Sequence, residues 1–287
     1  MATGIILGTV QFGMSYGINN SKGKPDLAVV DSILEEAFRL GIRCLDTAEA
    51  YGNAQEIVGY FHAKQNNFFA VNTKFIGLSK KEHRTKLNNA LQLLCVNQIN
   101  TYFYHSFKDY QCNPDLLDEL KKLKVDKLIQ NIGISVYTNE HFDIAINDPY
   151  IDVIQLPFNL LDNFSRRGTL ISKAKKANKM IQVRSVFLQG LFFKELNALP
   201  AFLLPLKPYL LQIHSLMQET GISMESLCLQ YANAQQEIDE MIIGVDTREQ
   251  LVNNMNVLNI ALDNKIVDAV NNIHVKETKL LYPYNWK

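Results

Sequence analysis

The chain has 287 residues, with 29 basic and 29 acidic side chains and a formal net charge of zero. This balance argues against a nucleic acid or an anionic membrane surface as the main partner. A hydrophobic share of 47% excludes a disordered chain, and the length fits one α/β barrel, which commonly has roughly 250 residues.

The N-terminus and the cysteines indicate the compartment. The first residues, MATGIILGTVQFG, lack the basic start and long apolar run of a signal peptide, and no stretch approaches the ~18–20 apolar residues of a membrane span. Cys44, Cys95, Cys112 and Cys228 lie far apart without CxxC spacing, so we expect reduced thiols and no metal site. A soluble, cytoplasmic protein is expected.

Short apolar or β-branched runs recur along the chain, as is typical of strands buried on both faces. The expected strands are residues 5–9, 43–48, 69–75, 101–106, 129–136, 152–158, 180–186 and 240–245. Stretches with helical spacing predict helices at residues 27–40, 82–95, 114–124, 163–178 and 246–261. A strand-then-helix unit eight times over predicts a (β/α)8 TIM barrel, and the lack of a linker makes residues 1–287 a single domain.

Two segments exceed what a barrel needs. Residues 190–239, after the seventh strand, are long enough for a loop and two helices, and residues 263–275 suggest a further helix before the tail ETKLLYPYNWK. Both fit extra packing, and both fit a pocket wall, because insertions after barrel strands lie over the barrel mouth.

Four polar side chains follow the ends of three consecutive predicted strands. Asp46 and Tyr51 come at and after the second strand, Lys74 ends the third and His105 ends the fourth. The carboxyl ends of barrel strands share one rim, where chemistry takes place, so we expect these four to converge.

Taken singly, three of these residues have ordinary explanations. Asp46 could cap a turn, Tyr51 could be packing, and His105 could be a core histidine. Lys74 is harder to explain, because a lysine inside the apolar run VNTKFIG loses its hydration unless it is paired, and Asp46 is the natural counter-ion.

Together the four suit proton donation to an alkoxide as it forms, and so carbonyl reduction. We expect the Lys74 ammonium, held by Asp46, to lower the pKa of the Tyr51 phenol, and His105 to hydrogen-bond the substrate oxygen.

The sequence resembles the aldo-keto reductase family over nearly its whole length. The motifs that carry the resemblance are LGTVQFG, LDTAEAYGNAQEIVG, VNTKF, FYHS, IGISVY, VIQLPFN, VRSVFLQGLF and IIGVDTREQLVNN. The resemblance implies an NADPH-dependent reductase of aldehydes or ketones with Tyr51 as proton donor and Lys74, Asp46 and His105 in support. The RSVFLQG motif resembles a bacterial subgroup often linked to sugar metabolism, so a sugar-type carbonyl is one expectation.

The resemblance also implies a set of cofactor contacts. Ser135 and Gln155 match the nicotinamide carboxamide positions, and the loops after the seventh and eighth strands match the diphosphate and adenosine positions. The implied contacts are Gly8, Thr9, Ser135, Gln155, Arg184, Ser185, Phe187, Gln189, Gly190, Gly244, Val245, Asp246, Arg248, Gln250, Asn253 and Asn254.

The chain departs from the family pattern at three cofactor positions. Val136 replaces a common Asn, and Arg184 replaces an aromatic residue that stacks on the nicotinamide. Asp246 replaces a small hydroxyl residue near the adenosine 2′-phosphate, and it would repel that phosphate unless Arg248 compensates. NADPH is therefore expected first, with NADH as the alternative.

Two other functions fit the same sequence. A barrel of this family also serves as a redox-silent nucleotide-binding regulatory protein, and Lys74 could act as a Schiff-base nucleophile in a lyase. The expected partner is a small-molecule carbonyl substrate, and the expected state is a monomer, with a weak dimer as the alternative. The candidate pocket residues are Phe12, Tyr16, Asn72, Phe75, Phe107, Phe158, Asn159, Arg184, Tyr282, Tyr284 and Trp286.

Overall fold

The computed structural model describes residues 3–20, 23–65, 68–77 and 82–286. Eight parallel strands form a closed barrel in chain order, with the first strand paired to the eighth. They are β1 (Gly4–Gly8), β2 (Cys44–Asp46), β3 (Ala70–Phe75), β4 (Ile99–Tyr104), β5 (Ile129–Ser135), β6 (Val153–Pro157), β7 (Met180–Arg184) and β8 (Glu240–Ile243). Each predicted strand overlaps an observed one, so the predicted (β/α)8 barrel is confirmed.

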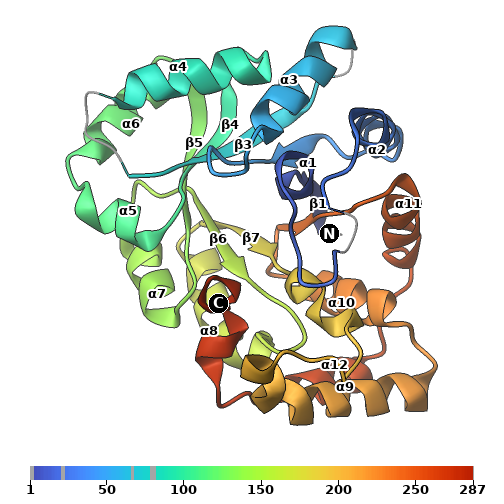
Figure 1. Cartoon of the computed structure of the whole chain (residues 1–287). Coiled ribbons are helices and arrows are strands. Elements are labelled where there is room, and N and C mark those ends of the chain that lie inside the picture. The colour runs from blue at the N-terminus through green and yellow to red at the C-terminus, as the bar shows by residue number, and fades with distance from the viewer. Residues whose placement is uncertain (1–2, 21–22, 66–67, 78–81, 287) are drawn as a thin grey trace.

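Helices surround the strands as an outer ring (Figure 1). The α-helices are α1 (Val10–Gly13), α2 (Leu27–Arg39), α3 (Ala54–Lys64), α4 (His83–Leu94), α5 (Phe107–Cys112), α6 (Leu116–Val125), α7 (Asn139–Asn147), α8 (Phe164–Lys176), α9 (Lys207–Thr220), α10 (Met224–Asn233), α11 (Arg248–Val257) and α12 (Asn264–Asn271). Within the described ranges, no helix is long and apolar enough to cross a membrane.

The apolar stripe of α2 shows why these segments are helical. Val30, Ile33, Leu34 and Ala37 recur at helical spacing and are all fully buried against the barrel. The helix stops before Gly41, whose φ of +88° suits a residue without a side chain.

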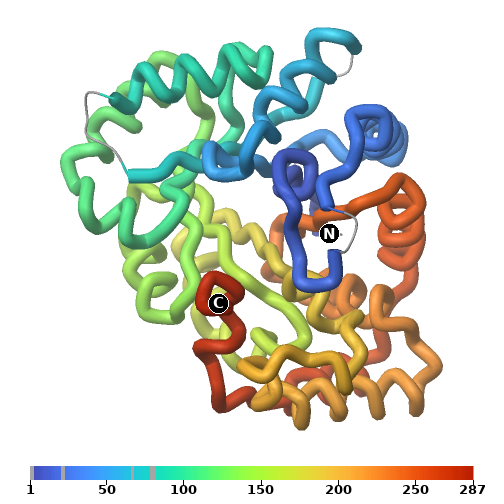
Figure 2. The backbone as a smooth tube through the Cα atoms, in the orientation of Figure 1, coloured from blue at the N-terminus to red at the C-terminus, as the bar shows by residue number. Residues whose placement is uncertain are grey.

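The chain closes on itself at the first and last barrel helices. Figure 2 shows α2, in blue, beside α11, in orange-red, although they are far apart in sequence. The Arg248 guanidinium at the start of α11 donates to the Glu36 carboxylate of α2 through Nε at 3.1 Å and Nη2 at 2.9 Å. This ion pair lies next to the last predicted cofactor segment.

The two extra segments have the predicted helices. Residues 190–239 contain α9 and α10, preceded by the 3-10 turns η1 (Leu188–Phe193) and η2 (Ala201–Leu206), and the predicted helix after the barrel is α12. The tail forms two more 3-10 turns, η3 (Thr278–Leu281) and η4 (Pro283–Asn285). Tyr284 in η4 packs edge-on against Tyr137, which follows β5, with ring centroids 4.6 Å apart. The tail therefore reaches the carboxyl end of the barrel.

A buried ion pair fixes the loop that carries Tyr137. The Arg167 side chain of α8 is fully buried and donates to both carboxylate oxygens of Asp162, at 2.8 and 2.7 Å. It also donates to Asn139 Oδ1 at 2.6 Å and to the Tyr137 carbonyl at 2.5 Å. The loops after β5 and β6 are thus tied together by one guanidinium.

Candidate active site

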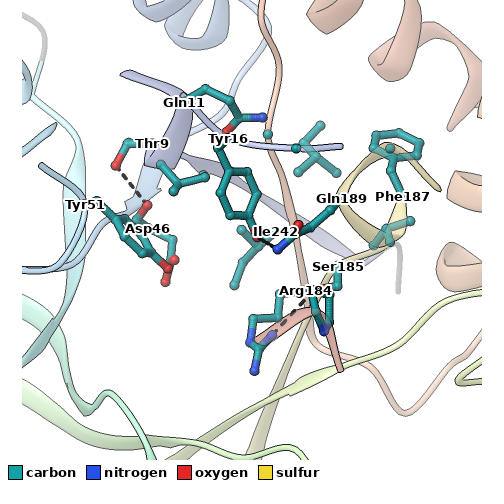
Figure 3. Close-up of a pocket in the computed structure, with 18 of the residues that line it drawn as sticks. Thr9, Gln11, Tyr16, Asp46, Tyr51, Arg184, Ser185, Phe187, Gln189 and Ile242 are labelled. Atoms are coloured by element: carbon teal, nitrogen blue, oxygen red, sulfur yellow. Dashed lines mark hydrogen bonds between the residues drawn. The ribbon is translucent and has the colours of Figure 1, made fainter. Parts of the chain in front are cut away.

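A cavity of about 920 Å³ opens at the carboxyl ends of the strands. Asp46, Tyr51, Lys74 and His105 all line it, so the structure brings the four predicted residues together. In Figure 3, Tyr51 and Asp46 lie on one side of this cavity and Arg184 comes in from another, with Tyr16 between them. This is the rim at which barrel enzymes carry out chemistry.

Lys74 and Asp46 form a buried ion pair at the floor of the cavity. Lys74 Nζ donates to Asp46 Oδ2 and, at 3.3 Å, to the Thr47 carbonyl. The two residues are only 2% and 4% exposed. Burial lowers the pKa of Lys74, and the Asp46 carboxylate opposes this shift by stabilising the ammonium.

Gln155 holds the other oxygen of the same carboxylate. Its Nε2 donates to Asp46 Oδ1 at 2.9 Å, and the residue is fully buried in β6. Gln155 Nε2 also donates to Gln182 at 3.3 Å, and Gln182 Nε2 donates to Glu240 at 2.7 Å. Asp46 is therefore fixed from beneath by a row of polar side chains inside the barrel.

The Tyr51 ring lies directly over this ion pair. Lys74 Nζ is 5.2 Å from the centroid of the Tyr51 ring, and the Tyr51 and His105 rings meet edge-on with centroids 5.8 Å apart. Burial, and secondly the Asp46 carboxylate, raise the pKa of the Tyr51 phenol, while Arg184 acts to lower it. The expectation of a lowered pKa is therefore wrong for this arrangement, and the Tyr51 phenol keeps its proton at neutral pH.

Two glycines allow the backbone of Tyr51 to sit where it does. A side chain at Gly13, at the end of α1, would come within 1.7 Å of the Tyr51 carbonyl oxygen. A side chain at Gly52 would come within 2.4 Å of the Gly13 carbonyl oxygen, and Gly52 has φ +55°. The turn after β2 thus packs backbone to backbone against α1, which only glycine permits at this distance.

His105 is neutral at physiological pH. Burial, then the charges of Lys74 and Arg184, lower its pKa to about 4. Its Nδ1 is buried and has no hydrogen-bond partner among the described residues. A neutral imidazole has one N–H to donate, so His105 can hydrogen-bond a substrate oxygen without adding a charge.

Arg184, the last residue of β7, projects into the cavity from another side. Its guanidinium lies 4.2 Å above the centroid of the Tyr137 ring, and Nη1 is 3.4 Å from Ser185 Oγ. The guanidinium is thus held against the Tyr137 ring by a cation–π contact.

The loop after β7 has an unusual backbone. Ser185, Leu188 and Gln189 have φ values of +60°, +45° and +54°, and Gly190 has φ +86°. Left-handed conformations at residues other than glycine are costly and cluster at functional sites. The Leu188 and Gly190 N–H groups donate to the Ser185 and Phe187 carbonyls at 2.8 and 2.9 Å, so the loop holds this tight course through its own backbone.

Gln11 of α1 and Gly244, the residue after β8, meet at another part of the cavity wall. A side chain at Gly244 would come within 2.5 Å of the Gln11 amide, and Gln11 Oε1 is buried with no hydrogen-bond partner among the described residues. Both residues line the cavity. An unsatisfied amide oxygen beside a bare backbone is a place for a ligand with hydrogen-bond donors.

The other predicted cofactor contacts divide into two groups. Those that line the cavity are Gly8, Thr9, Ser135, Arg184, Ser185, Phe187, Gln189, Gly190, Gly244, Asp246, Gln250 and Asn254. Gln155 and Val245 are buried behind it, Asn253 is exposed, and Arg248 is bound to Glu36.

The predicted substrate residues divide in the same way. Tyr16, Phe107, Arg184 and Tyr284 line the cavity. The remaining candidates do not, and several of them are core residues: Phe12, Asn72, Phe75, Phe158, Asn159, Tyr282 and Trp286.

Sequence reasoning missed Tyr137 and Gln11. Both occur inside quoted motifs, IGISVY and LGTVQFG, and both follow the end of a strand, which was the available signal. His141 was also missed; it stacks on Phe107 with ring centroids 3.9 Å apart at the cavity wall. It lies on α7, where nothing in the sequence marks it.

The residues present fit a nicotinamide dinucleotide. The strained loop at residues 185–190, the unsatisfied Gln11 amide and the bare wall at Gly244 lie around the same cavity as Tyr51. Across the described ranges, no group of three or more His, Cys, Asp or Glu side chains is placed to hold a metal ion.

A closed parallel barrel with polar side chains gathered at the carboxyl ends of its strands is the architecture of a barrel enzyme. The chain belongs to the aldo/keto reductase family, whose family model matches residues 4–274. Among curated proteins it is 24% identical to D-arabinose 1-dehydrogenase from Saccharomyces cerevisiae over 272 residues, 84% of this chain and 78% of that protein.

Solved structures show the same fold at lower identity. A holo-form aldo-keto reductase from Bacillus halodurans matches with a TM-score of 0.76 at 18% identity, covering 95% of this chain and 92% of that one. The glycerol dehydrogenase from Gluconobacter oxydans matches with a TM-score of 0.73 at 22% identity, covering 94% and 90%.

Proposed function

We propose that this protein is a NAD(P)H-dependent reductase of aldehydes or ketones, with Tyr51 as the proton donor. The observation that carries the proposal is the Tyr51 phenol placed beside the buried Lys74–Asp46 pair and beside His105 at one rim. A bound reduced nicotinamide supplies the hydride.

The protein's part is to place the carbonyl and move one proton. His105 donates a hydrogen bond to the substrate oxygen, and Tyr51 transfers its proton to that oxygen as negative charge develops. The Lys74 ammonium, 5.2 Å from the ring centroid, then stabilises the tyrosinate, and Asp46 keeps the ammonium in place. Lys74 Nζ is already bonded to Asp46 and the Thr47 carbonyl, which does not support a Schiff-base role.

The cofactor would be held by the loop at residues 185–190, by Gln11 and Ser135, and by the start of α11. NADPH is proposed first, with only a weak preference over NADH. The preference is weak because Arg248, which could offset the charge of Asp246, is bound to Glu36 instead. The Glu36 carboxylate is ionised, since its hydrogen bonds to Arg39 and Arg248 lower its pKa to about 2. Sugar-type carbonyls fit the names of two relatives, D-arabinose 1-dehydrogenase and glycerol dehydrogenase.

The test is Tyr51→Phe, assayed by NAD(P)H oxidation against a panel of aliphatic, aromatic and sugar aldehydes. Removing the acid is expected to lower kcat by about 10²–10⁴-fold, with the Kd of NAD(P)H changed by less than about twofold. Tyr60→Phe, at an exposed position of α3, is the matched control. Near wild-type turnover in Tyr51→Phe would contradict the assignment, and tight NAD(P)H binding without oxidation by the unmodified protein would favour the redox-silent function.

A further inference from the structure

Arg184 is a cation without an acidic partner inside the candidate active site. Its contacts are the Tyr137 ring at 4.2 Å and Ser185 Oγ at 3.4 Å, and no Asp or Glu of the described residues lies within ion-pair distance of it. A half-buried guanidinium with no counter-ion is costly unless an anion reaches it.

The ionisable groups around Tyr51 and Arg184, here called the inner cavity, sum to one positive charge, that of Arg184. Lys74 is cancelled by Asp46, and His105 is neutral. Burial raises the pKa of the Tyr16 phenol to about 12 and also raises the pKa of the Tyr51 phenol, so neither adds a negative charge at neutral pH. The other charged residues lining the cavity are Lys108 and Glu225, which are exposed, and Asp246, which is half-buried in the loop after β8.

Two tyrosines, Tyr137 and Tyr16, lie beside the Arg184 guanidinium at the cavity. The Tyr137 ring contacts the guanidinium and is itself packed by Tyr284, with ring centroids 4.6 Å apart. Tyr16 accepts a hydrogen bond from Gln189 Nε2 at 3.1 Å, which leaves the Tyr16 hydroxyl proton to donate to a ligand. Figure 3 shows Arg184, Tyr16 and Tyr51 around one space.

We propose that Arg184 binds a carboxylate on the substrate, so that the preferred substrates are oxo acids whose aldehyde or ketone carbon lies at Tyr51. The proposal rests on the proposed reductase function and names its substrate class. A planar guanidinium matches a carboxylate with two parallel hydrogen bonds, and a single negative charge balances the inner cavity. A phosphate of charge about −1.5 to −2 would exceed that charge.

The first experiment compares substrates that differ in one group. The kcat/KM of NAD(P)H oxidation is measured for 4-oxobutanoate against butanal, and for glyceraldehyde 3-phosphate against glyceraldehyde. We expect 4-oxobutanoate to exceed butanal by about 10- to 100-fold, the range of one charge-assisted contact. A larger advantage for the phosphate pair would overturn the carboxylate assignment in favour of a phosphate.

The second experiment changes Arg184. In Arg184→Gln the ratio of kcat/KM for 4-oxobutanoate to that for butanal is expected to fall by about 10-fold or more. Arg184→Lys keeps the charge but loses the bidentate hydrogen bonds, so its ratio should lie between those of the wild type and Arg184→Gln. Arg84→Gln, at an exposed ion pair with Asp126, is the control that should leave the ratio unchanged. If Arg184→Gln raises the KM of NAD(P)H and the ratio stays the same, Arg184 serves the cofactor and the proposal is wrong.

A binding measurement separates this proposal from the reductase function. Calorimetry of 4-hydroxybutanoate and of butan-1-ol is carried out with NAD(P)⁺-saturated Tyr51→Phe, so that the bound NAD(P)⁺ does not oxidise the two alcohols and the heat reports binding alone. Tighter binding of the acid that is lost in Arg184→Gln supports the anion site even if no aldehyde is reduced. Equal binding of the acid and the alcohol overturns it even if aldehydes are reduced.

Discussion

Replacing Asp46 by Asn tests the central ion pair without changing its shape. Lys74 Nζ and Asp46 Oδ2 are in direct contact, and both side chains are almost completely buried. The substitution leaves an ammonium in the barrel with only neutral acceptors, the new side-chain amide oxygen and the Thr47 carbonyl, and no counter-ion. Breaking one side of a buried pair typically costs about 3–5 kcal/mol of folding free energy.

The size of the loss has a ceiling, because the lysine can give up its proton. A free Lys side chain has a pKa of about 10.4, and each pH unit below that value corresponds to about 1.36 kcal/mol, so a neutral Lys74 at pH 7 costs about 4.6 kcal/mol relative to the unfolded chain. The unfolded chain then binds one more proton than the folded variant. The stability deficit of Asp46→Asn should therefore shrink by about 1.4 kcal/mol per pH unit between pH 7 and 9.

The assay is urea unfolding of the wild type, Asp46→Asn, Lys74→Met and the double variant at pH 7, 8 and 9. The double variant should be less destabilised than the sum of the single ones by about 2 kcal/mol or more, since it has no unpaired charge. Asp126→Asn, which breaks the exposed pair with Arg84, should cost less than about 1 kcal/mol and show no such pH slope. Additive single variants, or a deficit that does not change with pH, would show that the reasoning about this pair is wrong.

Three further predictions concern other parts of the molecule. Because the pKa of His105 is about 4, kcat/KM should show no ionisation near 6.5 and should fall only as the pH approaches 4; an inflection near 6.5 that disappears in His105→Gln would contradict this. Asp246→Ser should lower the KM of NADPH by about 10-fold relative to that of NADH, since it removes a charge beside the expected 2′-phosphate, and equal changes for both cofactors would place that phosphate elsewhere. Arg167→Met should lower the unfolding free energy by about 3–5 kcal/mol in urea titrations, because it removes the buried guanidinium that bonds both Asp162 carboxylate oxygens, Asn139 and the Tyr137 carbonyl. Asp162 keeps Arg166, whose Nε lies 3.1 Å from Oδ1, and a loss below about 1 kcal/mol would mean that the Arg167–Asp162 pair contributes little.

The strands were predictable because each is a short apolar run that is covered on both faces. The barrel was predictable because eight such strands alternate with helices along the chain. The sequence pattern did not predict the residue ranges of the helices α3 and α7. In α3, the polar side chains of Gln55 and His62 are buried together with Ile57, Val58 and Phe61, which obscures its apolar period. The helix α7 has only nine residues, too few for a clear pattern.

The four residues at the rim were predictable because each comes at or soon after the end of an apolar run. Their energetics were not, since the direction of the Tyr51 pKa depends on how completely the ring is buried, and only the folded chain decides that. Phe75 and Phe158 were wrongly expected at the pocket because both belong to the packed core. Tyr137 lies in a loop, whose course depends on distant contacts such as that of Arg167 with the Tyr137 carbonyl, and Gln11 lies in α1, a helix of only four residues.

The contact between Gly13 and Gly52 affects how far the active site can vary. A methyl group at Gly13 would overlap the peptide oxygen of Tyr51, so the turn would have to move and take the phenol with it. Selection for chemistry at Tyr51 therefore also acts on two positions that have no side chain. A relative that keeps all four polar groups but carries alanine at either glycine would need a different path for the chain between β2 and α3 before its tyrosine could serve as an acid.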